Sequence, residues 1–255
     1  MTLSDACAVA LKDPAAAPLT PADFLLTRGY TRDSARLFMR SQPGFLGRAL
    51  TLADARALAQ AAGDAGLATV LVRETDIPLP PAAVRAAKLE PKAGGFDIVA
   101  GGAIKFIPYG SVSLIAAAAF DAPAGQPRLE TLGHGLFAGL MRLAGIKGYE
   151  PVSETGPLET FFRADLIAED GALRLLLEPE NLDFSPLGAA RSHSSLVNFR
   201  ILLATLAAGC PGAVKNPFLT AFLANSPLAP LKLASPEACD TSLSRLLLLT
   251  PKRAV

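Results

Sequence analysis

The chain has 255 residues, of which 51% are apolar and 18% are charged, and its formal net charge is +1 at pH 7. This length is sufficient for two small domains, each with a core of its own. A net charge so close to zero gives no overall field that would attract nucleic acid or an anionic membrane, so neither is expected as a partner.

Three cysteines, Cys7, Cys210 and Cys239, lie far apart in the sequence. They form neither a CxxC pair nor a zinc-ligand spacing, and their odd number argues against a disulfide framework. The first residues have no basic flank before an apolar stretch, and the most apolar run, 112–120, is far too short to cross a bilayer. We therefore expect a cytoplasmic protein with no metal and no cofactor.

Residues 1–76 contain three predicted helices, each of which begins with a threonine. Thr20, Thr31 and Thr51 each precede a helical pattern, where a threonine hydroxyl accepts a hydrogen bond from the first turn of the helix. Short apolar runs typical of strands flank these helices, at residues 7–11, 45–50 and 67–72. The order of these elements predicts a small βααβαβ domain.

Residues 77–83 contain three prolines in four positions, which neither a helix nor the interior of a strand tolerates. We interpret this segment as a Pro-rich linker between a domain at 1–76 and a β-rich domain at 84–226. In the second domain the pattern predicts strands at 84–89, 96–99, 104–107, 112–120, 161–168 and 173–177. The last two strands form a predicted hairpin through Glu169-Asp170-Gly171.

A helix capped by Ser194 or Ser195 and running to Gly209 is predicted to close the β-rich domain. A short helix is expected at 218–223. Residues 227–255 have the composition of a loosely ordered tail, although 243–249 is apolar enough to dock on another element. The predicted fold class is therefore α+β, with a small βααβαβ domain followed by a β-rich domain closed by a C-terminal helix.

A resemblance extends over residues 1–76 and is carried by TPADFL at 20–25, RGYT at 28–31, SAR at 34–36, Pro43-Gly44 and a third helix ending at Ala65-Gly66. This pattern resembles the small fold shared by the C-terminal domain of the bacterial ribosomal stalk protein and the Clp protease adaptor. Both are binding modules, which implies a non-enzymatic role. The lysine-rich character of the stalk domain is missing here, and so is the adaptor's histidine. The resemblance therefore implies the fold and not the ligand.

The second half carries LDFSPLG at 182–188 and SSLVNFR at 194–200. These segments resemble an uncharacterised bacterial family. Strands closed by one helix also resemble a pleckstrin-homology-like domain, an analogy that implies architecture and not function.

The arginines Arg32, Arg36 and Arg40 are spaced i, i+4 and i+8, and Arg28 lies just upstream. On a helix this spacing forms one stripe, and guanidinium groups suit carboxylate partners. The stripe is either a docking face for an acidic segment of a protein partner or an ordinary solvated helix face.

The segment Gly133-His134-Gly135 begins a G-x-G-x-x-A pattern of the kind that brings backbone N–H groups to a pyrophosphate. Dinucleotide binding is not favoured, because no good strand precedes the pattern and none follows it before Pro151. The glycine-rich segment 133–148 is nevertheless a candidate ligand-binding lid.

His193 lies among Ser192, Ser194 and Ser195, and Asp183 is the nearest carboxylate in the sequence. Serines before a helix are usually caps, and no nucleophile-elbow motif occurs, so no catalytic residue is predicted. We expect Phe199 in the core. Its neighbours Asn198 and Arg200 are expected to bond to strand ends near Asp183 or Asp165, in a structural role.

Three hypotheses of function follow. The leading one is a non-enzymatic, cytoplasmic adaptor or scaffold, with a protein-binding arginine face and unpaired strand edges that hold a peptide. An alternative is a small-molecule binder or atypical enzyme that uses residues 133–148. A third is a structural subunit of a larger assembly, which includes an oligomer of this chain, because the apolar content is high.

Overall fold

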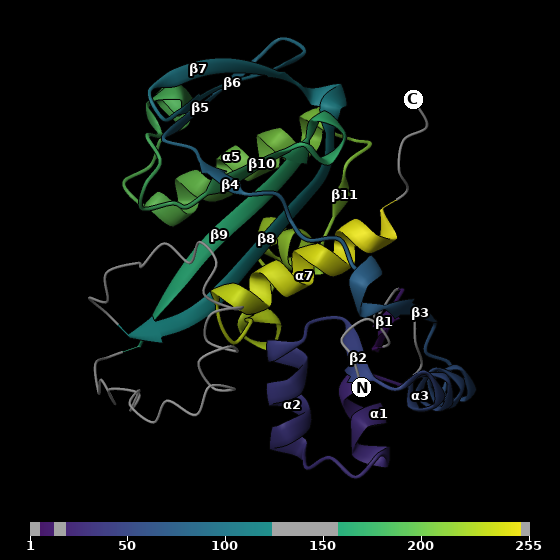
Figure 1. Cartoon of the computed structure of the whole chain (residues 1–255). Helices are drawn as coiled ribbons and strands as arrows, with labels where there is room; N and C mark the ends of the chain where they lie inside the picture. The colour runs from purple at the N-terminus through teal and green to yellow at the C-terminus, as the bar shows by residue number, and fades with distance from the viewer. Residues whose placement is uncertain (1–5, 13–18, 124–157, 251–255) are drawn as a thin grey trace, which may run out of the picture.

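The computed structural model describes residues 6–12, 19–123 and 158–250, and these residues form an α+β protein (Figure 1). The predicted fold class is therefore confirmed. None of the helices in these ranges has the length and apolarity needed to cross a bilayer.

The N-terminal part is a three-stranded antiparallel sheet covered on one face by helices. Its strand order is β2-β1-β3, so β2 and β3 are the edges. The elements are β1 (Cys7–Leu11), α1 (Pro21–Thr27), α2 (Arg32–Ser41), β2 (Phe45–Leu50), α3 (Leu52–Asp64) and β3 (Thr69–Arg73). This is the predicted βααβαβ order.

The predicted threonine caps are confirmed at all three helices of this part. The hydroxyl of Thr20 accepts a hydrogen bond from the N–H of Asp23, that of Thr31 from Ser34, and that of Thr51 from Asp54. Each bond satisfies one of the N–H groups that the first turn leaves without a helical partner.

The β-rich part contains two further sheets. The larger has the order β11-β8-β9-β10-β4, and the smaller is the antiparallel meander β5-β6-β7. Their strands are β4 (Ala83–Arg85), β5 (Lys88–Lys92), β6 (Gly95–Ala100), β7 (Ala103–Pro108), β8 (Val112–Pro123), β9 (Leu158–Ala168), β10 (Leu173–Leu177) and β11 (Val214–Lys215). The predicted hairpin between β9 and β10 is confirmed, with Glu169, Asp170 and Gly171 all at positive φ in its turn.

The main core of the β-rich part lies between these two sheets and the helices α5 (Ser195–Gly209) and α6 (Pro217–Leu223). Phe199 is buried in it, as predicted, and Ser194 is the cap of α5. Short 3-10 turns complete the chain, at Glu74–Asp76, Tyr109–Ser111, Glu169–Gly171, Ser185–Ala190 and Ala229–Leu231.

The prediction of one strand at 84–89 is wrong, because two strands of different sheets occupy this region. β4 pairs in parallel with β10, whereas β5 pairs with β6. The change of sheet falls between two neighbouring residues: the N–H of Ala86 donates to Leu176, and that of Ala87 donates to Val99. An apolar pattern does not reveal which of two partners each backbone group selects.

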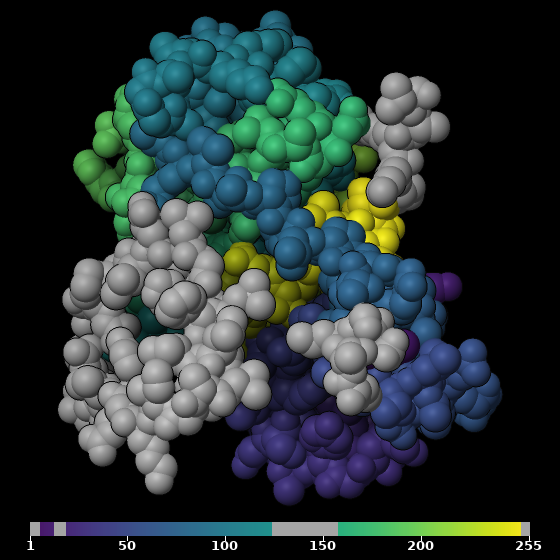
Figure 2. All heavy atoms as spheres, viewed as in Figure 1, coloured from purple at the N-terminus to yellow at the C-terminus, as the bar shows by residue number. Residues whose placement is uncertain are grey.

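The expectation of a loosely ordered tail from residue 227 is wrong for α7 (Pro236–Leu249), a helix that lies between the two parts of the molecule. One side of α7 packs Leu243 and Leu246 against Leu114 and Ile167 of the larger sheet. Near its end, Leu248 packs on the face of the N-terminal sheet opposite α1–α3. Atoms of α7 (yellow) are visible between the two parts in the space-filling view (Figure 2).

Candidate interaction site

All four predicted arginines are exposed, and three of them, Arg28, Arg32 and Arg36, have no partner on a neighbouring element of the described chain. Arg28 is the C-cap residue of α1, and Arg32 and Arg36 lie on α2. Within the described ranges, their side chains form no hydrogen bond or ion pair with another residue. Exposed guanidinium groups without an internal carboxylate are available for an external one. Leu37, next to Arg36, is 61% exposed and adds an apolar contact point.

Arg40 differs from the other three because it joins α2 to the segment that precedes α7. Its Nε donates to the carbonyl of Lys232 at 3.1 Å, and its Nη2 donates to that of Leu233 at 3.3 Å. The backbone of Ala234 returns a hydrogen bond to the carbonyl of Arg40. The arginine stripe therefore consists of three residues without a partner on another described element and of Arg40, which connects α2 to the segment before α7.

A pocket of about 300 Å³ opens next to Arg28, where three helices meet the edge strand β2. It is lined by Leu25, Arg28, Tyr30, Phe38, Leu46, Gly47, Arg48, Leu50 and Leu58. Tyr30 is 40% exposed and meets Phe38 edge to face, with 5.9 Å between the ring centroids. The lining is thus mostly apolar with cationic groups, an arrangement suited to an apolar side chain that has an acidic neighbour.

The edge strand β2 carries a bulge beside this pocket. Cys7 pairs with Leu50 and Val9 with Gly47, so β2 has one residue more than β1 between these pairs. The bulge places Ala49 at φ 53°, a conformation that costs a residue other than glycine about 1 kcal/mol or more. Bulges redirect side chains, and they also discourage pairing at an exposed edge.

Glu74 stabilises this bulge. Its carboxylate accepts hydrogen bonds from the N–H of Ala49 at 2.8 Å and from the guanidinium of Arg48 at 2.5 Å. Burial alone would raise the pKa of Glu74, but the hydrogen bonds from Arg48 and Ala49 outweigh it and lower this pKa. A second hollow of about 290 Å³ is lined by these three residues and Gln42, whose Oε1 is buried with no hydrogen-bond partner in the described part of the chain.

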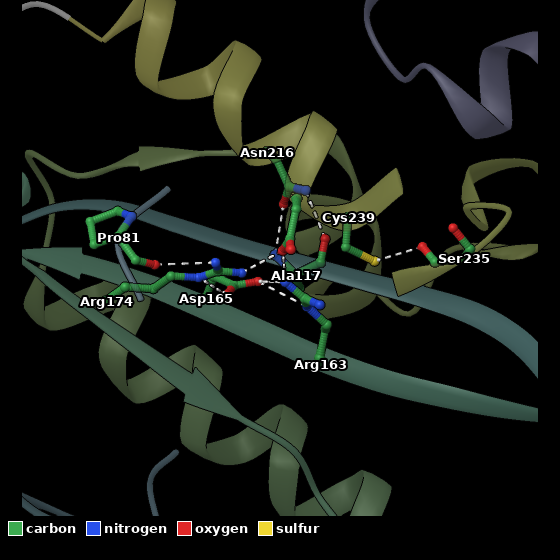
Figure 3. A network of polar contacts seen from close by, with 9 residues as sticks. Pro81, Ala117, Arg163, Asp165, Arg174, Asn216, Ser235 and Cys239 are labelled. Atoms are coloured by element: carbon green, nitrogen blue, oxygen red, sulfur yellow. Dashed lines mark hydrogen bonds and ion pairs between the residues drawn. The ribbon is translucent and has the colours of Figure 1, made fainter. Parts of the chain in front are cut away.

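A buried ion network fixes α7 against the larger sheet (Figure 3). On β9, the Nε of Arg163 donates to Asp165 at 3.0 Å, and on β10 the Nε of Arg174 donates to the same carboxylate at 2.8 Å. The Nη2 atoms of both arginines then converge on Asp240 of α7, at 2.8 and 2.6 Å. Two cations thus face two carboxylates, so the network is neutral and its charges satisfy one another.

Two neighbours of this network also have structural contacts (Figure 3). Asn216 pairs with Ala117 like a short strand, accepting from its N–H at 3.0 Å and donating to its carbonyl at 2.7 Å, and it caps α6. The thiol of Cys239 contacts the carbonyl of Ser235, and burial raises its pKa to about 12. A thiol with such a pKa is a poor nucleophile at neutral pH.

The serines around His193 act as helix and turn partners. Ser194 caps α5, and the hydroxyl of Ser192 accepts a hydrogen bond from the N–H of Ser194. The carboxylate of Asp183 accepts hydrogen bonds from Ser185, which lower its pKa. His193 is exposed. In the ranges that the structure describes, no group of His, Cys, Asp and Glu side chains could hold a metal ion.

The expected partners of Asn198 and Arg200 are wrong. Asn198 is bonded to the backbone N–H and carbonyl of Ser192, and so it fixes the chain before its own helix. Arg200 donates to Asn225 and lies over the ring of Phe222, with 5.3 Å to the centroid. Their role is structural, as predicted, but their contacts lie within the helical layer and not at the strand ends.

The candidate ligand-binding residues Gly133, His134 and Gly135 lie outside the described residues. Comparison of the chain with protein-family models, with curated proteins and with solved structures found no match in any of the three.

The pocket beside Arg28 is the part of the site that sequence reasoning missed. Its lining comes from α1, α2, β2 and α3, and most of these residues read simply as core positions of separate elements. The one local signal was Tyr30, a large aromatic residue in the turn between two capped helices, where a core position is not expected.

Proposed function

We propose that this chain is a non-enzymatic, cytoplasmic protein-interaction module, and that its α1–α2 surface binds an acidic segment of a protein partner. The observation that carries this proposal is Arg28, which lines an apolar pocket and whose guanidinium has no carboxylate partner among the described residues. Arg32 and Arg36 extend the same cationic surface along α2. The implied resemblance to binding modules of the stalk and adaptor type agrees with this role.

The chemistry of the surface defines the segment that would bind. An apolar side chain of the partner would fill the pocket between Tyr30, Phe38 and Leu58. Acidic residues next to it would then reach Arg28 and Arg36, because guanidinium groups bind carboxylates in a two-pronged geometry. Anchor residues in pockets usually supply most of the binding energy, and the surrounding charges supply selectivity.

Affinity capture from lysate tests the proposal, with the wild-type chain beside Arg28→Glu, Arg36→Glu and Arg56→Glu as baits. Arg56 is a matched control because it is an exposed arginine on α3 of the same part. We expect a partner that is retained by wild type and by Arg56→Glu but reduced at least about tenfold with the other two, since each reversal replaces attraction by repulsion.

Two further readouts identify the contact chemistry. Binding of the captured partner should weaken as salt is added, because exposed charge pairs are screened. Its binding segment, mapped by crosslinking, should contain Asp or Glu beside an apolar residue. A partner that binds all four baits equally well, or no partner specific to the wild type, would contradict the proposal.

A further inference from the structure

The edge strand β7 has backbone groups that the described structure leaves open. β6 and β7 form a regular antiparallel ladder in which Ile107 pairs with Phe96, and the N–H of Tyr109 donates to Gly94. In such a ladder, hydrogen bonds to the neighbouring strand alternate along each strand. Residues 103, 105, 107 and 109 therefore bond inward to β6, and the N–H and carbonyl groups of Ile104 and Phe106 point outward.

Two prolines agree with this assignment. Pro108 is one of the residues of β7 whose backbone groups point away from β6. Pro91 of β5 likewise has its backbone groups on the outer edge of the sheet, away from β6. Neither proline therefore removes a hydrogen bond inside the sheet. Pro108 also ends the usable edge, because it has no N–H to donate. The open donors of β7 are then those of Ile104 and Phe106.

The side chains of the same two residues are unusually exposed. Ile104 is 73% exposed and Phe106 is 47% exposed, on the face of β7 opposite the buried Ile107. The ring of Phe106 lies over Gly95, where an added Cβ would come within 2.6 Å of its Cζ. Apolar side chains next to open backbone groups are the features that natural edge strands normally avoid.

We propose that β7 is a self-association site, where it pairs antiparallel with β7 of a second copy around a twofold axis at Lys105. Antiparallel pairing requires outward groups on both strands to face each other. Centring the axis on Lys105 brings Ile104 opposite Phe106 of the second copy and, by symmetry, Phe106 opposite Ile104 of that copy. Both pairs are bonded through their open N–H and carbonyl groups, and their apolar side chains meet on one face.

The charges at the axis do not oppose a second copy, because each lysine there has a carboxylate partner. Lys105 would face Lys105 of the second copy, and like charges directly opposite are destabilising. Lys105 is, however, ion-paired with Glu169 of its own chain at 2.5 Å. The axis would therefore carry two cations and two carboxylates, which is a balanced arrangement. This inference concerns the β-rich part and is independent of the proposed arginine surface.

Disulfide trapping tests the register directly. Residue 105 would form a non-hydrogen-bonded pair with itself, with about 4.5 Å between the Cα atoms, a separation that a disulfide can bridge. Under mild oxidation, Lys105→Cys should give a covalent dimer, and Ile104→Cys, whose opposite residue is Phe106, should give at least about tenfold less. The native cysteines are all buried and provide a low background.

Sedimentation over a range of concentrations tests the association without a crosslink. We expect a reversible dimer for wild type and a monomer for Phe106→Lys, with both proteins folded by circular dichroism. Leu79→Lys is the matched control, because Leu79 is 86% exposed but lies outside the strands, and it should still dimerise. Arg36→Glu should dimerise as well, which separates this result from the outcome for the arginine surface.

Two results would overturn the inference. One is a wild-type chain that stays monomeric at every concentration, with no trapping through Lys105→Cys. The other is a dimer that persists in Phe106→Lys, since that dimer must use another surface. If β7 binds a strand of a different protein and not a second copy, the purified chain stays monomeric, which is the first of these results.

Discussion

Arg174 and Asp240 are separated by 66 positions in the sequence, yet the Nη2 of Arg174 donates to Oδ1 of Asp240 at 2.6 Å. Asp165 completes the arrangement by accepting from Arg174 and Arg163 beneath the helix. An ion network of this kind contributes little net stability as a whole, but removing one member leaves uncompensated charge in the core. Its effect is to select one position of α7 on the sheet.

Substitution of Asp165 by Asn should therefore be strongly destabilising. Among the described residues, it would leave the buried guanidinium groups of Arg163 and Arg174 with only the half-exposed Asp240 as a carboxylate partner. We expect the free energy of unfolding in urea to fall by about 3 kcal/mol. Asp170→Asn, in the exposed hairpin turn, is the control and should change it by less than about 0.5 kcal/mol. A loss below about 1 kcal/mol for Asp165→Asn would show that the network is not coupled to folding.

Asp240 should make the stability depend on acid pH. Burial alone would raise its pKa, but the attraction of Arg163 and Arg174 outweighs burial and holds this pKa below the ordinary 3.8. A carboxyl group with a lowered folded-state pKa stabilises the fold above its ordinary pKa, and this contribution is lost as the pH falls towards the folded-state value. The difference in unfolding free energy between wild type and Asp240→Asn should thus be full at neutral pH and shrink below pH 3.8. Urea unfolding of both proteins at neutral pH and below pH 3.8 measures this difference. A difference that is the same at the two pH values would contradict the prediction.

Local chemistry made the N-terminal part predictable. Each of the three helix caps, Thr20, Thr31 and Thr51, accepts a hydrogen bond from the N–H of the residue three positions later. The sequence signal and its structural consequence therefore lie in one short segment. The same holds for the hairpin turn at Glu169-Asp170-Gly171. Such features depend on neighbouring residues and need no knowledge of distant contacts.

α7 was missed although its start carries the same type of signal, with Ser235 as the cap and Pro236 at the first helical position. Its apolar residues face both parts of the molecule: Leu243 contacts the larger sheet and Leu248 contacts the N-terminal sheet. A helix that is buried on two sides lacks the single apolar stripe by which a helix is usually recognised. The ion network and the pocket beside Arg28 depend on the same long-range arrangement.

The cysteines should be inert in the folded protein. All three are buried and none is in a disulfide, and burial raises the pKa of Cys239 to about 12 and also raises that of Cys210. Because the thiolate is the reactive form, we expect a thiol reagent at neutral pH to modify them only as fast as the chain unfolds. The measurement compares labelling rates with and without urea. Rapid labelling of one cysteine in native buffer would reveal local opening, and mass spectrometry would identify the residue.

Gly44 and Arg245 form the contact through which α7 holds the end of β1. Arg245 is buried, and it donates to the carbonyls of Leu11 at 2.9 Å and Lys12 at 3.0 Å. A Cβ added to Gly44 would lie 2.1 Å from the Cδ of Arg245, so Gly44→Ala must displace the guanidinium from these carbonyls. Gly44 also has φ +80°, a conformation that favours glycine.

Gly29→Ala separates these two effects, because Gly29 has φ +89° but no atom within 4 Å of an added Cβ. We expect Gly29→Ala to lower the unfolding free energy by about 1 kcal/mol from backbone strain alone. Gly44→Ala should lower it by about 3 kcal/mol, because buried hydrogen bonds of a charged group are lost in addition. Urea unfolding of both variants gives the comparison. Equal losses would mean that Arg245 moves aside freely, and that its bonds to β1 do not hold the two parts together.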